Sequence, residues 1–142
     1  MELTDRHRTY LQDHHAAAMI TIARDGMPKA VRVGVALVGD RLWSSGTADR
    51  VRTKRLRRDP RCTLFVFDQA YSFLTIEARV TILDGPDAPQ QNLALFRVMQ
   101  GRPTGPLNWY GDELDDEAFL ARMTAEQRVI YEFAPTHAYG PA

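Results

Sequence analysis

The sequence predicts a mainly β domain of the α+β class, in which six antiparallel strands close into a barrel and helices cover its open ends. Runs of alternating apolar and polar residues, the pattern of half-buried strands, recur along the chain. The dipeptides Asp25-Gly26 and Gly39-Asp40 separate the first three runs, as tight turns do in an antiparallel meander. Because six strands in so short a chain leave unpaired edges, closure into a barrel is the expected solution.

Length and composition narrow the class of protein further. A chain of 142 residues is long enough to bury a core, and we expect one domain over residues 1–142. Lys and Arg together number 18, as do Asp and Glu, so the net charge is zero, which argues against nucleic-acid and membrane-surface binding. The N-terminus lacks the apolar segment of a signal peptide, and the single Cys62 cannot form an internal disulfide. We therefore expect a cytoplasmic protein.

The period of the pattern and the turn residues place each element in order. Thr4 is expected to cap the first helix, and Thr47 or Asp49 the second, which ends before Pro60. The segment 101–111 is irregular and is expected to form a lid or an interface. The expected strands are 16–24, 29–38, 41–45, 62–67, 73–83 and 128–133, and the expected helices are 5–13, 49–58, 87–100 and 112–124.

Alternation within the strands predicts which side chains face the barrel interior. In the strand over 29–38 the branched residues fall on one face, and Arg32, Gly34 and Ala36 fall on the other. The strands over 62–67 and 73–83 alternate in the same way. The predicted interior residues of these three strands are Val31, Val33, Val35, Leu37, Cys62, Leu64, Val66, Leu74, Ile76, Ala78, Val80 and Ile82.

The densest chemical signal is the basic run from Arg50 to Pro60, which holds six cationic residues at and after a helix N-terminus. Free backbone N–H groups and the positive end of the helix dipole favour an anion there. Arg50, Arg52, Thr53 and Lys54 would add donors, and a phosphate group is the natural ligand. A solvated basic helix face is the competing interpretation, and the neutral net charge weakens a third, DNA binding.

A second candidate site lies on two neighbouring strands, where Arg32-Val33-Gly34 faces Ser44-Ser45-Gly46. Small residues at facing strand positions allow a flat ring to lie on the sheet with backbone groups in reach. We therefore include Ser45 and Gly46 in the candidate site. The alternative is two ordinary stretches of β-strand.

Other chemistries find no support in the sequence. His7, His14, His15 and His137 lack the spacing of a metal site, so we expect no metal. No serine lies in a nucleophile elbow, and Cys62 lies within an apolar strand, where it should be inert. No catalytic acid or base stands out. Tyr71, Tyr110 and His137 are weak candidates for a proton donor.

Several segments, in order along the chain, carry a resemblance to a known family. They are Thr21–Pro28 in the first hairpin, Arg50-x-Arg52-Thr53 running into Leu56–Arg61, Tyr71-Ser72-Phe73 through Glu77, and His137-Ala138-Tyr139-Gly140. With these segments the sequence resembles the pyridoxamine-phosphate-oxidase-like split-barrel flavoproteins over roughly residues 8–140. It is most similar to the actinobacterial branch of probable coenzyme F-420-dependent enzymes. Arg52 and Arg55 stand where the family often has lysine and asparagine.

The resemblance implies a six-stranded antiparallel split barrel of the FMN-binding type that forms a homodimer with two cofactor sites at the subunit interface. The cofactor ring would rest on the strands that hold Arg32-Val33-Gly34 and Ser45-Gly46. Its phosphate would bind at the helix that follows Arg50, and Phe73 would come from the partner chain.

The implied activity is that of an oxidoreductase in which reduced coenzyme F-420 passes a hydride to a small unsaturated or conjugated organic substrate. The cofactor carries such chemistry, while the protein binds, orients and shields it. Two alternatives remain open at this point. One is an FMN-dependent reductase or oxidase of the same fold, and the other is a module that binds flavin, haem or tetrapyrrole without turnover.

Overall fold

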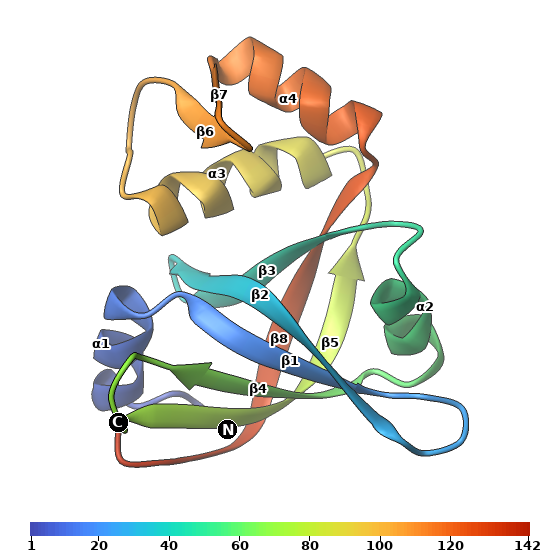
Figure 1. Ribbon diagram of the computed structural model, residues 1–142, viewed down its shortest axis with the longest axis vertical. Helices are drawn as coiled ribbons and strands as arrows, with labels where there is room; N and C mark the ends of the chain where they lie inside the picture. The colour runs from blue at the N-terminus through green and yellow to red at the C-terminus, as the bar shows by residue number, and fades with distance from the viewer.

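A closed barrel of six antiparallel strands forms the centre of the computed structural model, which describes residues 1–142 (Figure 1). The strand order around the barrel is β1–β2–β3–β8–β5–β4, and pairing of β1 with β4 closes it. The expected fold class is therefore confirmed. The barrel strands are β1 (Ala16–Ile22), β2 (Pro28–Val38), β3 (Arg41–Thr47), β4 (Arg61–Phe67), β5 (Phe73–Leu83) and β8 (Arg128–Tyr139).

Four helices and one small hairpin surround the barrel. Helices α3 and α4 and the hairpin β6–β7 lie together over one end of the barrel and form a roof (Figure 1). Helix α1 lies beside the opposite end, and α2 connects β3 to β4. Their bounds are α1 (Asp5–Asp13), α2 (Val51–Arg58), α3 (Ala88–Gln100), β6 (Leu107–Trp109), β7 (Asp112–Leu114) and α4 (Asp116–Ala125).

The barrel core follows the predicted alternation. The interior residues expected on β2, β4 and β5 belong to the main core or pack against it, and most are buried. On β1, Ala17, Met19 and Thr21 point inward. The roof has a core of its own, made by Leu93, Leu107, Trp109, Phe119 and Met123.

Two helix caps test the capping predictions, with different outcomes. The Thr4 hydroxyl accepts a hydrogen bond from the His7 amide at 3.2 Å, and the His7 ring accepts one from the Thr4 amide, so this cap is confirmed. The predicted cap of α2 is wrong. Arg50 occupies that position without a side-chain cap bond, while the Thr47 hydroxyl donates to the Asp49 carboxylate at 2.8 Å.

The segment before α4 differs from the prediction. Residues 112–114 form strand β7, and the helix begins only at Asp116, because Asp115 caps it by accepting a hydrogen bond from the Ala118 amide at 2.8 Å. β6 and β7 are joined by the two-residue turn Tyr110–Gly111, both of whose residues have positive φ, as the most common hairpin turn requires. The acidic residues had suggested one longer helix.

Strand β8 is also longer than predicted. It continues past Pro135 to Tyr139 because a register shift between Glu77 and Ala78 of β5 accommodates the proline. None of the four helices is long and apolar enough to cross a membrane.

Candidate functional site

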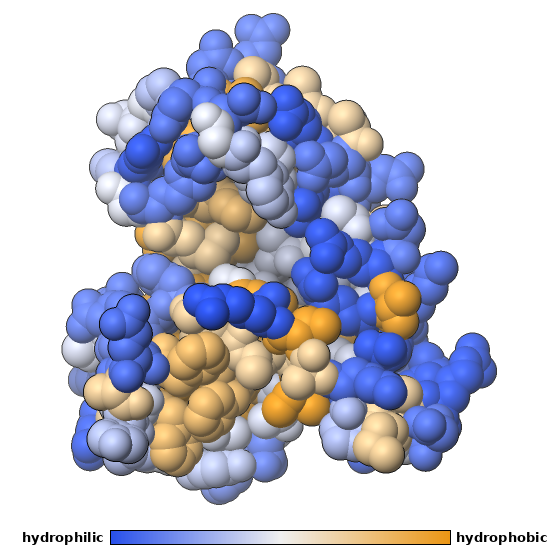
Figure 2. Space-filling model, in the orientation of Figure 1, coloured by the Kyte–Doolittle hydropathy of each residue, from blue (hydrophilic) through white to orange (hydrophobic).

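A cleft of about 560 Å³ separates the barrel from its roof. The hollow between the barrel and the roof is visible in the space-filling view (Figure 2). Its lining has four arginines and no carboxylate, which makes it an electropositive site. The lining residues are Arg32, Val33, Gly34, Ser45, Arg50, Arg52, Phe96, Met99, Gln100, Asn108, Trp109, Tyr110 and Arg128.

The floor of the cleft is formed by β2 and β3. Here the structure brings together the predicted residues Arg32, Val33, Gly34 and Ser45. Gly34 lies on the outward face of β2, as expected, but that face is covered by α3: a Cβ atom added at Gly34 would lie 2.8 Å from the Met99 sulfur. A ring placed over Gly34 therefore requires the flexible Met99 side chain to move aside.

A buried polar contact ties the floor to the roof. The Ser45 hydroxyl donates to the Asn92 side-chain oxygen at 2.5 Å, and the Asn92 amide nitrogen donates to the Ala88 carbonyl oxygen at 3.0 Å. Asn92 is fully buried within α3. Because buried polar groups are costly to leave unpaired, this contact fixes the position of α3 over the floor.

The mouth of the cleft carries an aromatic pair from the hairpin. Trp109 is buried and packs edge-on against Phe96 and Phe119, which anchors it in the roof. Tyr110, at the tip of the turn, is 81% exposed and has φ 51°. The segment predicted as a lid or interface therefore presents an exposed aromatic ring, Tyr110, beside the arginines of the cleft.

Arg52 is the most unusual side chain of the cleft. Its Nε is buried and has no hydrogen-bond partner, and its Nη2 makes only a long bond of 3.4 Å to the Ser45 carbonyl oxygen. Burial lowers the pKa of the Arg52 guanidinium, and the charges of Arg50 and Arg128 lower it further. No carboxylate pairs with Arg52. A half-buried cation with an unpaired nitrogen and no anion beside it is unfavourable, so the position fits an anionic group that completes the site.

Two other predicted residues lie inside the barrel rather than in the cleft. The Thr53 side chain is buried, donates to the Thr47 carbonyl oxygen at 2.7 Å and makes a short hydrogen bond with the Tyr131 hydroxyl. A Cβ atom added at Gly46 would lie 2.1 Å from that same Tyr131 oxygen. Thr53 and Gly46 therefore accommodate Tyr131 and support the cleft from behind.

Lys54 and Phe73 also lie away from the cleft. Lys54 faces a separate hollow of about 540 Å³ between α2 and the β1–β2 turn, together with Arg24, Arg55 and Arg58. Phe73 lies on the outer surface of the barrel, where its ring stacks on Phe65 with centroids 5.2 Å apart.

The sequence pattern did not indicate Arg128, which is buried at the start of β8. Its Nε donates to Glu126 at 3.0 Å and its guanidinium carbon lies 4.9 Å from the centre of the Trp109 ring. In the sequence, Arg128 is a single charged residue at the start of an apolar strand, and such a residue is ordinarily a solvent-exposed strand end. Its pairing with Thr47, just before α2, is what brings it to the cleft.

The candidate reactive side chains, Cys62 and the three proposed proton donors, differ in burial and in their distance from the cleft. Cys62 is buried, and burial raises the pKa of its thiol to about 12, so it stays protonated at neutral pH. Tyr71 and His137 are exposed and do not line the cleft. Of the proton-donor candidates, only Tyr110 does.

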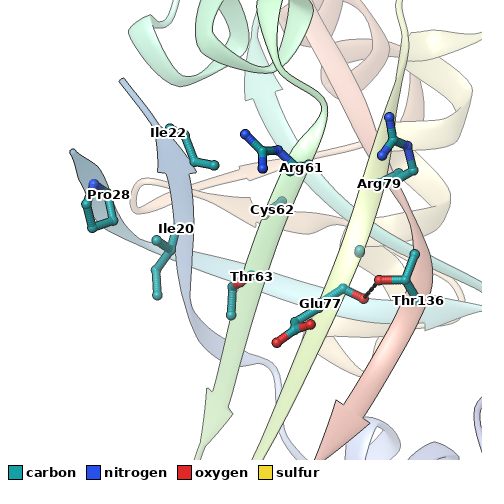
Figure 3. A pocket seen from close by; sticks show the side chains of 10 residues that line it. Ile20, Ile22, Pro28, Arg61, Cys62, Thr63, Glu77, Arg79 and Thr136 are labelled. Atoms are coloured by element: carbon teal, nitrogen blue, oxygen red, sulfur yellow. Dashed lines mark hydrogen bonds between the residues drawn. The ribbon is translucent and has the colours of Figure 1, made fainter. Parts of the chain in front are cut away.

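A hollow of about 390 Å³ lies on the outer face of the barrel (Figure 3). Side chains of β1, β4 and β5 project into it, among them Ile20, Thr63 and Glu77. Arg61 at its rim already pairs with Asp59 at 2.8 Å. Its mixed charge and paired arginine distinguish it from the cleft under the roof.

The closed six-stranded barrel with a helical roof defines the split-barrel class of proteins. The sequence profile of the pyridoxamine 5'-phosphate oxidase family matches residues 3–139, and the chain belongs to that family. At the level of the family, this supports a flavin-type oxidoreductase. No match was found among curated proteins.

Solved structures share the fold at low sequence identity. A conserved hypothetical protein from Mycobacterium tuberculosis is 17% identical with a TM-score of 0.74, covering 97% of this chain and 84% of that one. An F420 reductase is 21% identical with a TM-score of 0.68, covering 96% and 98%. A FAD-binding protein from Mesorhizobium loti is 16% identical with a TM-score of 0.62, covering 97% and 94%.

Proposed function

We propose that the chain is an oxidoreductase that binds coenzyme F-420 in the arginine-lined cleft and reduces a small unsaturated or conjugated organic substrate. The observation that carries this proposal is the half-buried guanidinium of Arg52, whose buried Nε is unpaired and which has no carboxylate beside it. A phosphate group of the cofactor supplies the missing anion. The F420 reductase of the same fold supports the choice of cofactor.

The residues of the cleft divide the work of binding. Arg50 and Arg52 hold the phosphate by charge-assisted hydrogen bonds. The flat ring lies on the floor at Arg32, Val33 and Gly34, with Ser45 at its edge, and Met99 moves to admit it. The bound cofactor supplies the hydride; the protein orients it and keeps water out.

The homodimer is part of the same proposal. The outward positions of β1, β4 and β5 form an outer apolar face, made of Ala18, Ile20, Phe65, Phe67 and Phe73, which the strand register places side by side. Hydrophobic side chains gather over β1 and β4 in the space-filling view (Figure 2). Phe65 is 37% exposed and stacks on both other phenylalanines. A second copy that covers this face would bring its own Phe73 toward the partner's cofactor.

The test of the cofactor is a titration of the purified protein with F-420 and with FMN, followed by quenching of Trp109 and Trp43 and by the absorbance of the bound cofactor. We expect F-420 to bind more tightly, and the reduced cofactor to be oxidised in the presence of a conjugated acceptor. Tighter binding of FMN than of F-420 would make FMN the proposed cofactor. Tight binding without oxidation by any acceptor would favour a binding module.

The test of the ring position is Gly34→Val. The new Cβ crowds only the flexible end of the Met99 side chain, its distance of 3.8 Å to the His15 carbonyl oxygen being an ordinary contact, and valine suits a strand, so circular dichroism should stay unchanged. Cofactor binding should be lost by steric overlap. Thr81→Val, at an exposed position of β5, is the matched control. If folded Gly34→Val binds the cofactor as tightly as the parent, the ring does not lie over Gly34.

The test of the dimer is light scattering. We expect a mass near twice 16.1 kDa for the parent. Phe65→Ser should yield the monomer and weaken cofactor binding, whereas Val98→Ser, which removes an exposed apolar side chain from α3, should change neither. A parental monomer with full cofactor affinity would contradict the shared site.

A further inference from the structure

Arg128 is held in place by two contacts that leave its outer nitrogens free. Its side chain is 7% exposed, and its Nε donates to Glu126 Oε1 at 3.0 Å. The guanidinium carbon lies over the Trp109 ring, 4.9 Å from its centre. Neither Nη donates a hydrogen bond to any protein atom, although the residue lines the cleft. Two donors therefore remain available at the cleft wall.

The same carboxylate also holds the hairpin. Glu126 Oε2 accepts a hydrogen bond from the Trp109 indole nitrogen at 3.1 Å. One glutamate thus fixes both the cation and the aromatic ring over which the cation lies. Such a locked guanidinium loses little freedom when it binds a ligand.

Arg52 and Arg128 line the same cleft and reach the same strand: Arg52 Nη2 donates to the Ser45 carbonyl oxygen of β3, and Arg128 is paired with Thr47, two residues further along. The buried Arg128 and the half-buried Arg52 repel each other, and only Arg128 has a carboxylate partner. An oxyanion with two negative charges would relieve the repulsion and would accept hydrogen bonds from both planar forks.

We propose that Arg52 and Arg128 form a paired clamp for one phosphoryl group, in which Arg128 is a ligand-binding residue positioned by Glu126 and Trp109. The clamp connects the ligand to the roof, because Trp109 belongs to the hairpin that carries Tyr110. Occupation of the clamp therefore changes the surroundings of Trp109. Only the assignment of the phosphoryl group to a cofactor rests on the function proposed above.

Inorganic pyrophosphate is the probe, titrated by calorimetry and by tryptophan fluorescence. Arg128→Gln removes charge-assisted hydrogen bonds and should weaken pyrophosphate binding by roughly 10- to 100-fold. Arg52→Gln should weaken it similarly, and the double variant should lose less than the product of the two factors, since both residues hold one group. The matched control, Arg79→Gln, removes an exposed arginine from the outer face of β5 and should bind as the parent does.

The fluorescence arm tests the connection to the roof. Pyrophosphate should change the emission of the parent but not of Trp109→Phe, which keeps only Trp43. Arg128→Lys keeps the charge without the planar fork, and it should bind better than Arg128→Gln but worse than the parent. It also serves if circular dichroism finds Arg128→Gln unfolded.

Each outcome decides between the clamp and the function. The clamp is overturned if the parent does not bind pyrophosphate. It is also overturned if folded Arg128→Gln binds pyrophosphate as tightly as the parent. Where Arg128→Gln is unfolded, unchanged binding by Arg128→Lys overturns it instead. If F-420 still binds the parent in that case, the proposed function stands without it. If the parent binds pyrophosphate through Arg128 but takes neither F-420 nor FMN, the clamp stands and the proposed function falls.

Discussion

Helix α2 separates two basic regions that share a charge and differ in burial. On its inner side, Arg52 is half-buried in the cleft, with a buried Nε that lacks a partner. On its outer side, Lys54 and Arg58 are exposed around an open hollow beside the β1–β2 turn. Both regions come from one continuous basic run in the sequence. Burial therefore separates a site that needs an anion from cations that water already solvates.

Gly46→Ala should have the largest effect, because it displaces Tyr131, the buried side chain that supports the cleft from behind. The added Cβ would lie 2.1 Å from the Tyr131 hydroxyl, and Tyr131 is fully buried in the barrel. We expect a loss of about 3 kcal/mol or more in the free energy of unfolding, measured in urea. Gly85→Ala, with open space around it, is the control. An unchanged midpoint would show that Tyr131 is free to move.

Arg52→Ala tests the inner side directly. Loss of a charge-assisted contact worth about 1.5–3 kcal/mol should weaken cofactor binding by roughly 10- to 100-fold. Thermal stability should hardly fall, because Arg52 makes only one long hydrogen bond within the protein. The dissociation constant comes from the cofactor titration. An unaltered value would remove Arg52 from the site.

Thr53→Val separates support from contact. Valine keeps the shape of threonine but removes the hydroxyl that bonds to Thr47 and Tyr131, leaving the buried Tyr131 oxygen without this partner. We expect the free energy of unfolding to fall by about 1–2 kcal/mol, with cofactor affinity reduced less than in Arg52→Ala. An affinity loss as large as that of Arg52→Ala, at unchanged stability, would instead make Thr53 a direct ligand.

The double substitution Lys54→Gln and Arg55→Gln should have the smallest effect. Lys54 is exposed and Arg55 is half-buried in the outer hollow, away from the cleft. Charges so placed contribute little at physiological salt, so cofactor affinity should change less than about threefold, and the change should shrink further as salt is raised. A loss comparable to that of Arg52→Ala would make the outer hollow part of the binding site.

The barrel was predictable from the sequence because its signals are local. Period-two alternation identified the interior residues of β2, β4 and β5, and Gly-containing turns identified the first meander. Local alternation did not predict the continuation of β8 beyond Pro135, since it depends on a register shift in a strand more than fifty residues away in the sequence. Only the resemblance of His137–Gly140 to the family's terminal strand pointed to it.

The candidate site was predictable only in part. Arg50 and Arg52 were found because they follow a turn and begin a helix, where an anion is favoured. Thr53 and Lys54 share that local pattern, yet their side chains point to the barrel interior and to the outer hollow. Arg128 had no local signal at all, because its contacts to the roof and to β3 are tertiary.

The position of β8 in the sheet has a consequence for folding. β8 is last in sequence but lies between β3 and β5; it pairs with β3 over residues 128–133 and with β5 over residues 130–139. During synthesis the sheet therefore stays open along two edges until residues 128–139 have emerged. Such non-local pairing slows folding and leaves apolar strand edges exposed meanwhile. The roof is made of residues that precede β8, and the last strand packs against it where Ile130 joins Leu95 of α3 in one buried cluster.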